Sequence, residues 1–64
     1  MLNDRYRILT PFVTLNGIET PVVNPVKVIT GVYWLRGEIS DIELDGGKLP
    51  VSMADWKKIS KEKC

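Results

Sequence analysis

The densest group of side chains able to do chemistry is the acidic run Asp41, Glu43 and Asp45, which alternates with apolar residues and ends at Gly46. Oxygen ligands at alternate positions before a glycine match the opening of a calcium-binding loop. The pattern then fails, because the twelfth position counted from Asp41 is Ser52, where a bidentate glutamate is required. We therefore interpret the run as the solvated edge of a strand that leads into a turn.

Catalytic chemistry has few candidate residues in this chain. Two carboxylates can divide general acid and base roles, but the chain has no histidine, and its one cysteine is Cys64. Gly46 and Gly47 precede Lys48, yet the spaced glycines of a phosphate-binding loop are missing. A chain of this length also has little material with which to enclose a cleft. We expect a protein that is not an enzyme, uses no metal or cofactor and takes no small-molecule substrate.

Length and composition indicate one small globular domain spanning residues 1–64, with 44% hydrophobic and 27% charged residues. A chain this short buries only about 60% of the surface that its unfolded form exposes, so its core is marginal. Support from a protein partner or from self-association is therefore expected. The formal net charge of +1 lacks the overall basic character of a nucleic-acid-binding or membrane-surface domain.

The chain carries no targeting pattern that we can identify. No apolar run approaches the roughly 20 residues needed to span a bilayer, and the start of the chain lacks the apolar region of a signal peptide. One cysteine forms no intramolecular disulfide, which excludes a disulfide-stapled secreted scaffold. We expect no membrane association and synthesis in the cytoplasm, and incorporation into a larger particle stays open.

The longest run of β-branched and aromatic residues, Val26–Leu35, predicts the central strand. Alternation along a strand gives an apolar set, which we expect to face the core, and a mixed set on a partly covered surface. The apolar set is Val26, Val28, Thr30, Val32 and Trp34. The mixed set is Lys27, Ile29, Gly31, Tyr33 and Leu35. Gly31 predicts a bulge or sharp bend in this strand.

The segment before the central strand predicts extended structure and one hairpin. In the stretch from Arg5 to Leu15 we expect a break at Pro11, with inward side chains at Tyr6, Ile8 and Phe12.

Asn16-Gly17 predicts a type I′ turn between Phe12–Leu15 and Ile18–Val23. Pro21 predicts an edge position for the second of these strands.

The segment after the central strand predicts two further turns. Arg36-Gly37 is followed by Glu38–Leu44, whose apolar residues change phase in a way that a bulge near Ser40 would reconcile. A second turn at Asp45–Lys48 leads to Leu49–Val51, which we expect to be a short edge strand because it contains a proline.

The last segment predicts one short helix. Ser52 followed by Asp55 resembles a capping box, and Met53, Trp56 and Ile59 recur on one helical face, with Trp56 docking the helix on the sheet. Lysines are expected to crowd the C-terminal half of this helix, where positive charge suits the helix dipole. They are Lys57, Lys58, Lys61 and Lys63.

Together these patterns predict a mostly β fold of about five short strands, either a small antiparallel sheet or an SH3-like or OB-like barrel, with one short C-terminal helix. For function we favour a non-catalytic interaction or assembly subunit that docks on a larger partner or on itself, as in a viral particle or multi-subunit complex. Its candidate interaction surface is Lys27, Ile29, Tyr33 and Leu35. The alternative is a nucleic-acid-binding or regulatory module. Its candidate contacts are Arg5, Arg7, Lys27, Tyr33, Lys57, Lys58 and Lys61.

Overall fold

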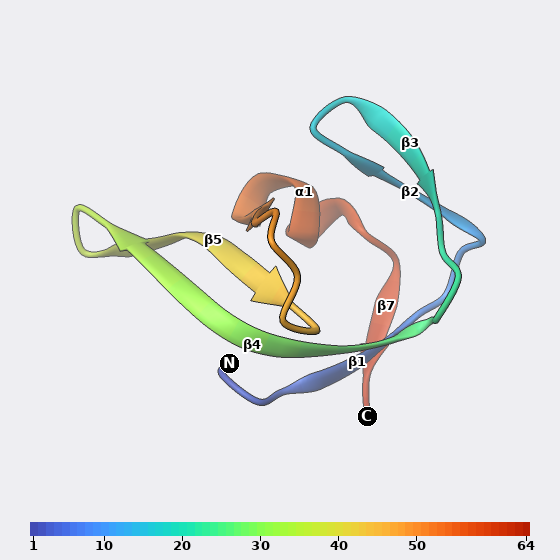
Figure 1. Ribbon diagram of the computed structural model, residues 1–64, viewed down its shortest axis with the longest axis horizontal. Coiled ribbons are helices and arrows are strands. Elements are labelled where there is room, and N and C mark those ends of the chain that lie inside the picture. The colour runs from blue at the N-terminus through green and yellow to red at the C-terminus, as the bar shows by residue number, and fades with distance from the viewer.

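The computed structural model describes residues 1–64 as a mostly β protein with one short helix (Figure 1). Five strands form an antiparallel sheet in the order β6-β5-β4-β1-β7, and β2 and β3 form a separate two-stranded hairpin. The elements in chain order are β1 Arg5–Ile8, β2 Phe12–Leu15, β3 Ile18–Pro21, β4 Val26–Leu35, β5 Glu38–Leu44, β6 Val51–Ser52, α1 Met53–Lys58 and β7 Lys61–Lys63.

The long strand β4 is central, as predicted, because it pairs with two different strands along its length. Val26–Val28 pairs with β1, whereas Ile29–Leu35 pairs with β5. The register shifts between Ile29 and Gly31, which leaves Thr30 as an extra residue. The Thr30 hydroxyl donates to Glu43 Oε2 at 2.7 Å and accepts from Gly46 N at 2.8 Å. This bulge lies beside Gly31, where a bend was predicted.

Two of the predicted turns are two-residue hairpin turns. Asn16 and Gly17 have φ of 53° and 78°, and Arg36 and Gly37 have φ of 52° and 80°. Positive φ at both central residues is the type I′ geometry that matches the twist of paired strands. The pairing of Phe12–Leu15 with the strand that starts at Ile18 is confirmed, although this strand ends at Pro21 and not at Val23.

The predicted bulge in β5 is also confirmed. Tyr33 pairs with Asp41 and the next residue, Trp34, pairs with Ile39, so Ser40 is the extra residue. A short edge strand was predicted at Leu49–Val51. β6 is short and lies at the edge of the sheet, but it begins after Pro50, at Val51.

Helix α1 begins as predicted, because Ser52 Oγ accepts a hydrogen bond from Asp55 N at 3.2 Å. The helix is shorter than the lysine pattern indicated. Lys61 and Lys63 lie in β7, a strand that we did not predict, and β7 pairs with β1. Lys61 still forms hydrogen bonds at the C-terminal end of the helix, since its Nζ donates to Trp56 O at 2.6 Å and to Ile59 O at 3.3 Å.

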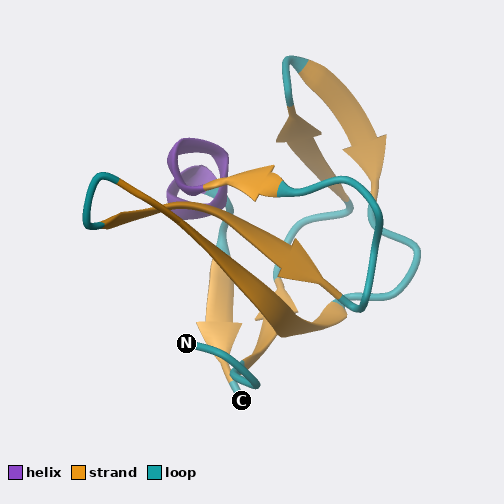
Figure 2. Ribbon diagram, turned by 60° about the vertical axis from the view of Figure 1, so that its left-hand side comes forward, coloured by secondary structure: helices purple, strands orange, loops and turns teal.

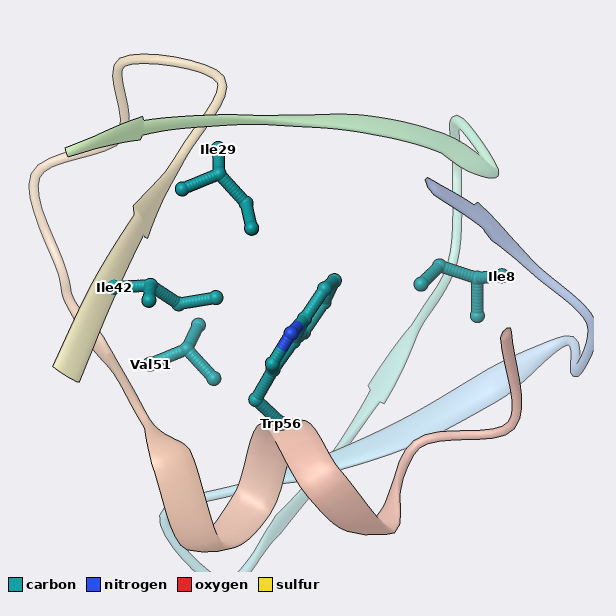
Figure 3. Close-up of a cluster of buried hydrophobic side chains, with 5 residues drawn as sticks. All are labelled: Ile8, Ile29, Ile42, Val51 and Trp56. Atoms are coloured by element: carbon teal, nitrogen blue, oxygen red, sulfur yellow. The ribbon is translucent and has the colours of Figure 1, made fainter. Parts of the chain in front are cut away.

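The core is a small cluster between the sheet and α1 (Figure 3). Trp56 extends from the helix into the centre of the cluster, with apolar side chains of the sheet on either side of its ring. Tyr6 meets this ring edge-on, with 5.3 Å between centroids. The five buried residues are Ile8, Ile29, Ile42, Val51 and Trp56.

The predicted faces of β4 are wrong at several positions. Val26 and Val28, expected to face the core, lie opposite Arg7 and Arg5 on the other face of the sheet from the core residue Tyr6, and Thr30 is exposed.

Ile29, expected on the surface, is 0% exposed in the core, and Trp34, expected in the core, is 66% exposed. The bulge at Thr30 changes the side-chain phase, so strict alternation does not hold along this strand. Trp34 lies on the same face of the sheet as its strand partner Ile39. It is exposed because it lies near the hairpin tip, beyond the core. Figure 1 shows this tip projecting beyond the rest of the molecule.

Phe12 is a second correction, because its side chain is exposed. Its strand partner Pro21 shares its face of the hairpin, whereas Val13 on the opposite face packs against the core. Tyr6 and Ile8 face inward as predicted.

Candidate functional site

The structure separates the four predicted interaction residues. Ile29 is buried in the core and so has no surface to offer a partner. Lys27 lies opposite Tyr6 and forms an ion pair with Asp45, with 3.5 Å between Nζ and Oδ2. Tyr33 and Leu35 are exposed near the end of β4. They remain as candidates, together with the exposed Trp34 between them.

These aromatic and apolar residues lie on a strand edge that has no partner. β1 pairs with β4 only as far as Val28, and the chain before β1 extends the contact to Ile29, which accepts from Asn3 N at 2.8 Å and donates to Asp4 O at 2.9 Å. From Thr30 to Leu35, β4 has a strand neighbour on its β5 side only. We call the other side of residues Thr30–Leu35 the open edge.

Backbone geometry identifies which residues present their hydrogen-bonding groups to the open edge. Ser40 Oγ on β5 donates to Tyr33 O at 3.4 Å, and Leu35 pairs with Glu38 next to the turn. Tyr33 and Leu35 therefore direct backbone groups toward β5. Since these groups alternate along a strand, Val32 and Trp34 direct theirs toward the open edge.

An apolar groove runs beside the open edge. It has a volume of about 490 Å³ and lies between the start of the chain and the far half of β4. Trp34 is the most exposed aromatic side chain in the molecule, and Leu2 beside it is also exposed. The residues that line the groove are Met1, Leu2, Thr30, Gly31, Val32, Trp34 and Ile39.

The open edge differs in composition from every other strand edge of the fold. β7 is Lys-Glu-Lys, β6 has two residues and follows Pro50, and Pro11 and Pro21 flank the β2–β3 hairpin. Charge, proline and short length are the usual means of keeping an edge from pairing. The open edge, Thr-Gly-Val-Tyr-Trp-Leu, has none of these.

The outward face of the β4–β5 hairpin is acidic. Glu38, Asp41 and Glu43 lie across from Leu35, Tyr33 and Gly31 respectively. Arg36 occupies the turn at the tip. No group of three or more His, Cys, Asp or Glu side chains is arranged to hold a metal ion.

The residues of the nucleic-acid alternative do not share one face. Arg5 and Arg7 lie opposite Val28 and Val26, whereas Lys27 lies opposite Tyr6 on the other face of the sheet. Tyr33 is at the far end of β4, near the hairpin tip. Lys57 and Lys58 are exposed on the helix.

Lys61, the last member of that set, is engaged within the fold. Its Nζ lies 4.5 Å from the centroid of the Trp56 ring, in addition to its bonds to the helix carbonyls. Partial burial lowers the pKa of Lys61 below its usual value. Its ammonium group is therefore occupied by intramolecular contacts.

Three other hollows border the β2–β3 hairpin, which Figure 2 shows standing apart from the main sheet. The tightest, about 100 Å³, lies under the hairpin against Ile8 and Trp56 and is mostly apolar. Asp55 borders the other two, and its Oδ2 accepts from Asn16 N at 3.0 Å. That carboxylate thus holds the hairpin tip to the helix.

Trp34, Met1 and Leu2 are the site residues that sequence reasoning missed. One available signal was the uncharged, proline-free run at the end of β4, which lacks the usual protection of an edge strand. The part played by Met1 and Leu2 depends on the contact between Asn3 and Ile29, which no local pattern encodes.

Comparison of the chain with protein-family models, curated proteins and solved structures finds no match. The single helix is too short and too polar to cross a membrane.

Proposed function

We propose that this protein is a non-catalytic assembly subunit that docks through the open edge of β4. The observation that carries the proposal is the exposed, uncharged strand edge with Trp34 beside an apolar groove. A strand added to such an edge gains main-chain hydrogen bonds, while pockets for its alternate side chains give specificity. The groove supplies the pocket for one face of an added strand.

The small core supports the same proposal. Only five residues are buried, and many large hydrophobic side chains remain exposed. Half of those exposed side chains gather around the open edge and groove: Met1, Leu2, Tyr33, Trp34 and Leu35. An apolar patch of this kind is the usual mark of an interaction site. A multi-subunit complex, such as a viral particle, is the setting we propose for it.

Nucleic-acid binding is the alternative, and fewer observations favour it. Arg5 and Arg7 are exposed on one face of β1, but Lys27 and Lys61 are engaged by Asp45 and Trp56. Phosphate binding gains most from several free cations on one surface. In this structure the free cationic side chains lie in small, separate groups.

We also infer that the sheet curls in the manner of an SH3-like barrel rather than an OB-like one. Two features support this inference. β4 contributes its first half to a sheet with β1 and its second half to a sheet with β5. The short helix comes directly before the last strand, which returns to pair with β1.

The assembly proposal is tested by the size of the species that carries the protein in extracts of the organism that encodes it. Wild-type protein should sediment well above its chain mass of 7.2 kDa, and Trp34→Lys should shift it toward that mass. Leu49→Lys is the matched control, because Leu49 is 81% exposed and lies away from the open edge. Unchanged sedimentation of Trp34→Lys would contradict the proposal.

A further inference from the structure

We propose that the occupant of the open edge is a second copy of this chain, with the two β4 strands pairing antiparallel around a two-fold axis at Tyr33. This inference rests on the proposed function and identifies its partner. The interface would be isologous, so each copy would supply the same edge and the same groove.

The backbone of the open edge permits this register. Val32 and Trp34 present backbone groups to the open edge, and antiparallel pairing requires such residues to face one another. A two-fold axis at Tyr33 places Val32 of each copy opposite Trp34 of the other. Both residues share the face that carries Ile42 and Ile39, so the pairing makes one continuous apolar surface across the axis.

Side chains on the opposite face of β4 also fit this register. The same register sets Tyr33 against its symmetry mate, and Leu35 against Gly31 of the other copy. The Glu43 side chain lies over Gly31, so the leucine would pack against the methylene groups of Glu43. Aromatic cross-strand pairs such as Tyr33 with its symmetry mate favour pairing. Asn3 and Asp4 occupy the β4 edge at Ile29. The pairing ends before Ile29, so the hydrogen bonds of Asn3 and Asp4 to Ile29 are kept.

The two ends of the open edge are complementary in charge. Arg36 directly follows the open edge, and Glu43 contacts Thr30 at its beginning. Antiparallel pairing brings Arg36 of one copy to the Thr30–Glu43 end of the other, and the two-fold axis makes this contact twice. The edge itself carries no charge that would repel its own copy.

The expected interface is modest in area. A standard interface buries about 800 Å² per partner, which is roughly a sixth of the 4628 Å² surface of this chain. The exposed aromatic and apolar side chains around the edge can supply a patch somewhat below that size. We therefore expect a reversible dimer with a Kd in the micromolar range.

Sedimentation equilibrium of the purified protein, from about 10 μM to about 1 mM, tests the proposal. Wild-type protein and Leu49→Lys should reach twice the chain mass. Tyr33→Lys should raise the dimer Kd at least about a hundredfold, because it sets two ammonium groups side by side at the axis. Circular dichroism should show that Tyr33→Lys keeps its fold, since Tyr33 is 49% exposed.

A series of charge changes tests the same register and does not depend on Tyr33. Arg36→Glu should weaken the dimer about three- to tenfold, because it places two carboxylates near each other. Glu43→Gln keeps an oxygen acceptor for Thr30, and the double variant should dimerise more tightly than Arg36→Glu alone. A dimer Kd unchanged by Tyr33→Lys, or a double variant that binds no more tightly than Arg36→Glu, would overturn the register.

A purified protein that stays monomeric throughout the range overturns the self-pairing itself. If Trp34→Lys still releases the chain from larger species in extracts, the assembly proposal survives that result and the partner is a different protein. If Trp34→Lys releases nothing, the assembly proposal fails as well.

Discussion

The two tryptophan side chains lie in opposite environments. Trp56 is 3% exposed at the centre of the core, whereas Trp34 is 66% exposed beside the groove. Aromatic residues supply large contact area in cores and at interfaces alike. We assign Trp56 to stability and Trp34 to docking.

Truncation of each tryptophan should separate these roles. Trp56→Ala should lower the free energy of unfolding by about 3–5 kcal/mol, which is comparable to the whole stability of a domain this size, on the order of 3–10 kcal/mol. Trp34→Ala should change it by less than about 1 kcal/mol at low protein concentration. Urea unfolding of dilute protein measures both. A loss of stability in Trp34→Ala as large as that in Trp56→Ala would place Trp34 in the core.

The contacts of Asp4 predict that the stability of the fold decreases as the pH falls into the acid range. The hydrogen bond from the Met1 ammonium group, 3.1 Å from Asp4 Oδ2, holds the pKa of this carboxyl below its ordinary value of 3.8, and Lys63 at 3.6 Å acts in the same direction. A carboxyl with a lowered pKa stabilises the fold above its unfolded pKa, and this contribution is lost as pH falls through the folded pKa.

Asp4→Asn should therefore lose stability near neutral pH and show a shallower fall in melting temperature below pH 4 than the wild type. Thermal melts across the acid range measure this. Glu19→Gln, which removes an exposed carboxyl outside the three ion pairs, is the control. Identical acid profiles for Asp4→Asn and the wild type would show that this cluster does not contribute to stability.

At the scale of elements, the helix is too short to be stable alone and depends on its cap and its packing. Ser52 Oγ accepts from Asp55 N, and Asp55 Oδ2 in turn accepts from Asn16 N on the β2–β3 hairpin. One short segment thus joins the helix start to the hairpin tip.

Ser52→Ala should lower the free energy of unfolding by about 1 kcal/mol through loss of the cap. Asp55→Ala should also release the hairpin tip, so the amide of Asn16 should exchange with solvent faster in Asp55→Ala than in Ser52→Ala. Urea unfolding and amide hydrogen exchange measure the two effects. Equal exchange of the Asn16 amide in both variants would contradict a direct link between helix and hairpin.

Elements set by local chemistry could be predicted from the sequence, and those set by distant contacts could not. Asn16-Gly17, the Ser40 bulge and the Ser52 cap each depend on residues within a few positions. β7 consists of three charged residues and forms only because β1 offers it an edge. The bulge at Thr30 depends on Glu43 and Gly46 across the sheet, and this contact decides which face of β4 is buried.

The same division holds for the candidate site. Tyr33 and Leu35 could be predicted as surface residues because they share a strand face with Gly31. Ile29 was misplaced because the phase changes after it, and Trp34 because a hairpin tip can reach beyond the core. The open edge begins after Ile29, the last β4 residue that forms hydrogen bonds with the segment before β1.

At the scale of the whole molecule, one edge of the sheet is left unprotected while the others are short, charged or flanked by proline. An uncharged aromatic edge of this kind is an aggregation hazard unless a partner covers it. Assembly therefore resolves two problems of a small β domain together, because it covers the edge and adds buried apolar surface to a marginal core.

The most direct test of this account is amide hydrogen exchange along β4, measured at low and at high protein concentration. The amide of Ile29 donates to Asp4 O within one chain and should be protected at both concentrations. The amides of Val32 and Trp34 should exchange rapidly in dilute protein and become protected as the dimer forms. Exchange at Val32 and Trp34 that is equally rapid at both concentrations, in a sample that self-associates, would contradict docking through the open edge.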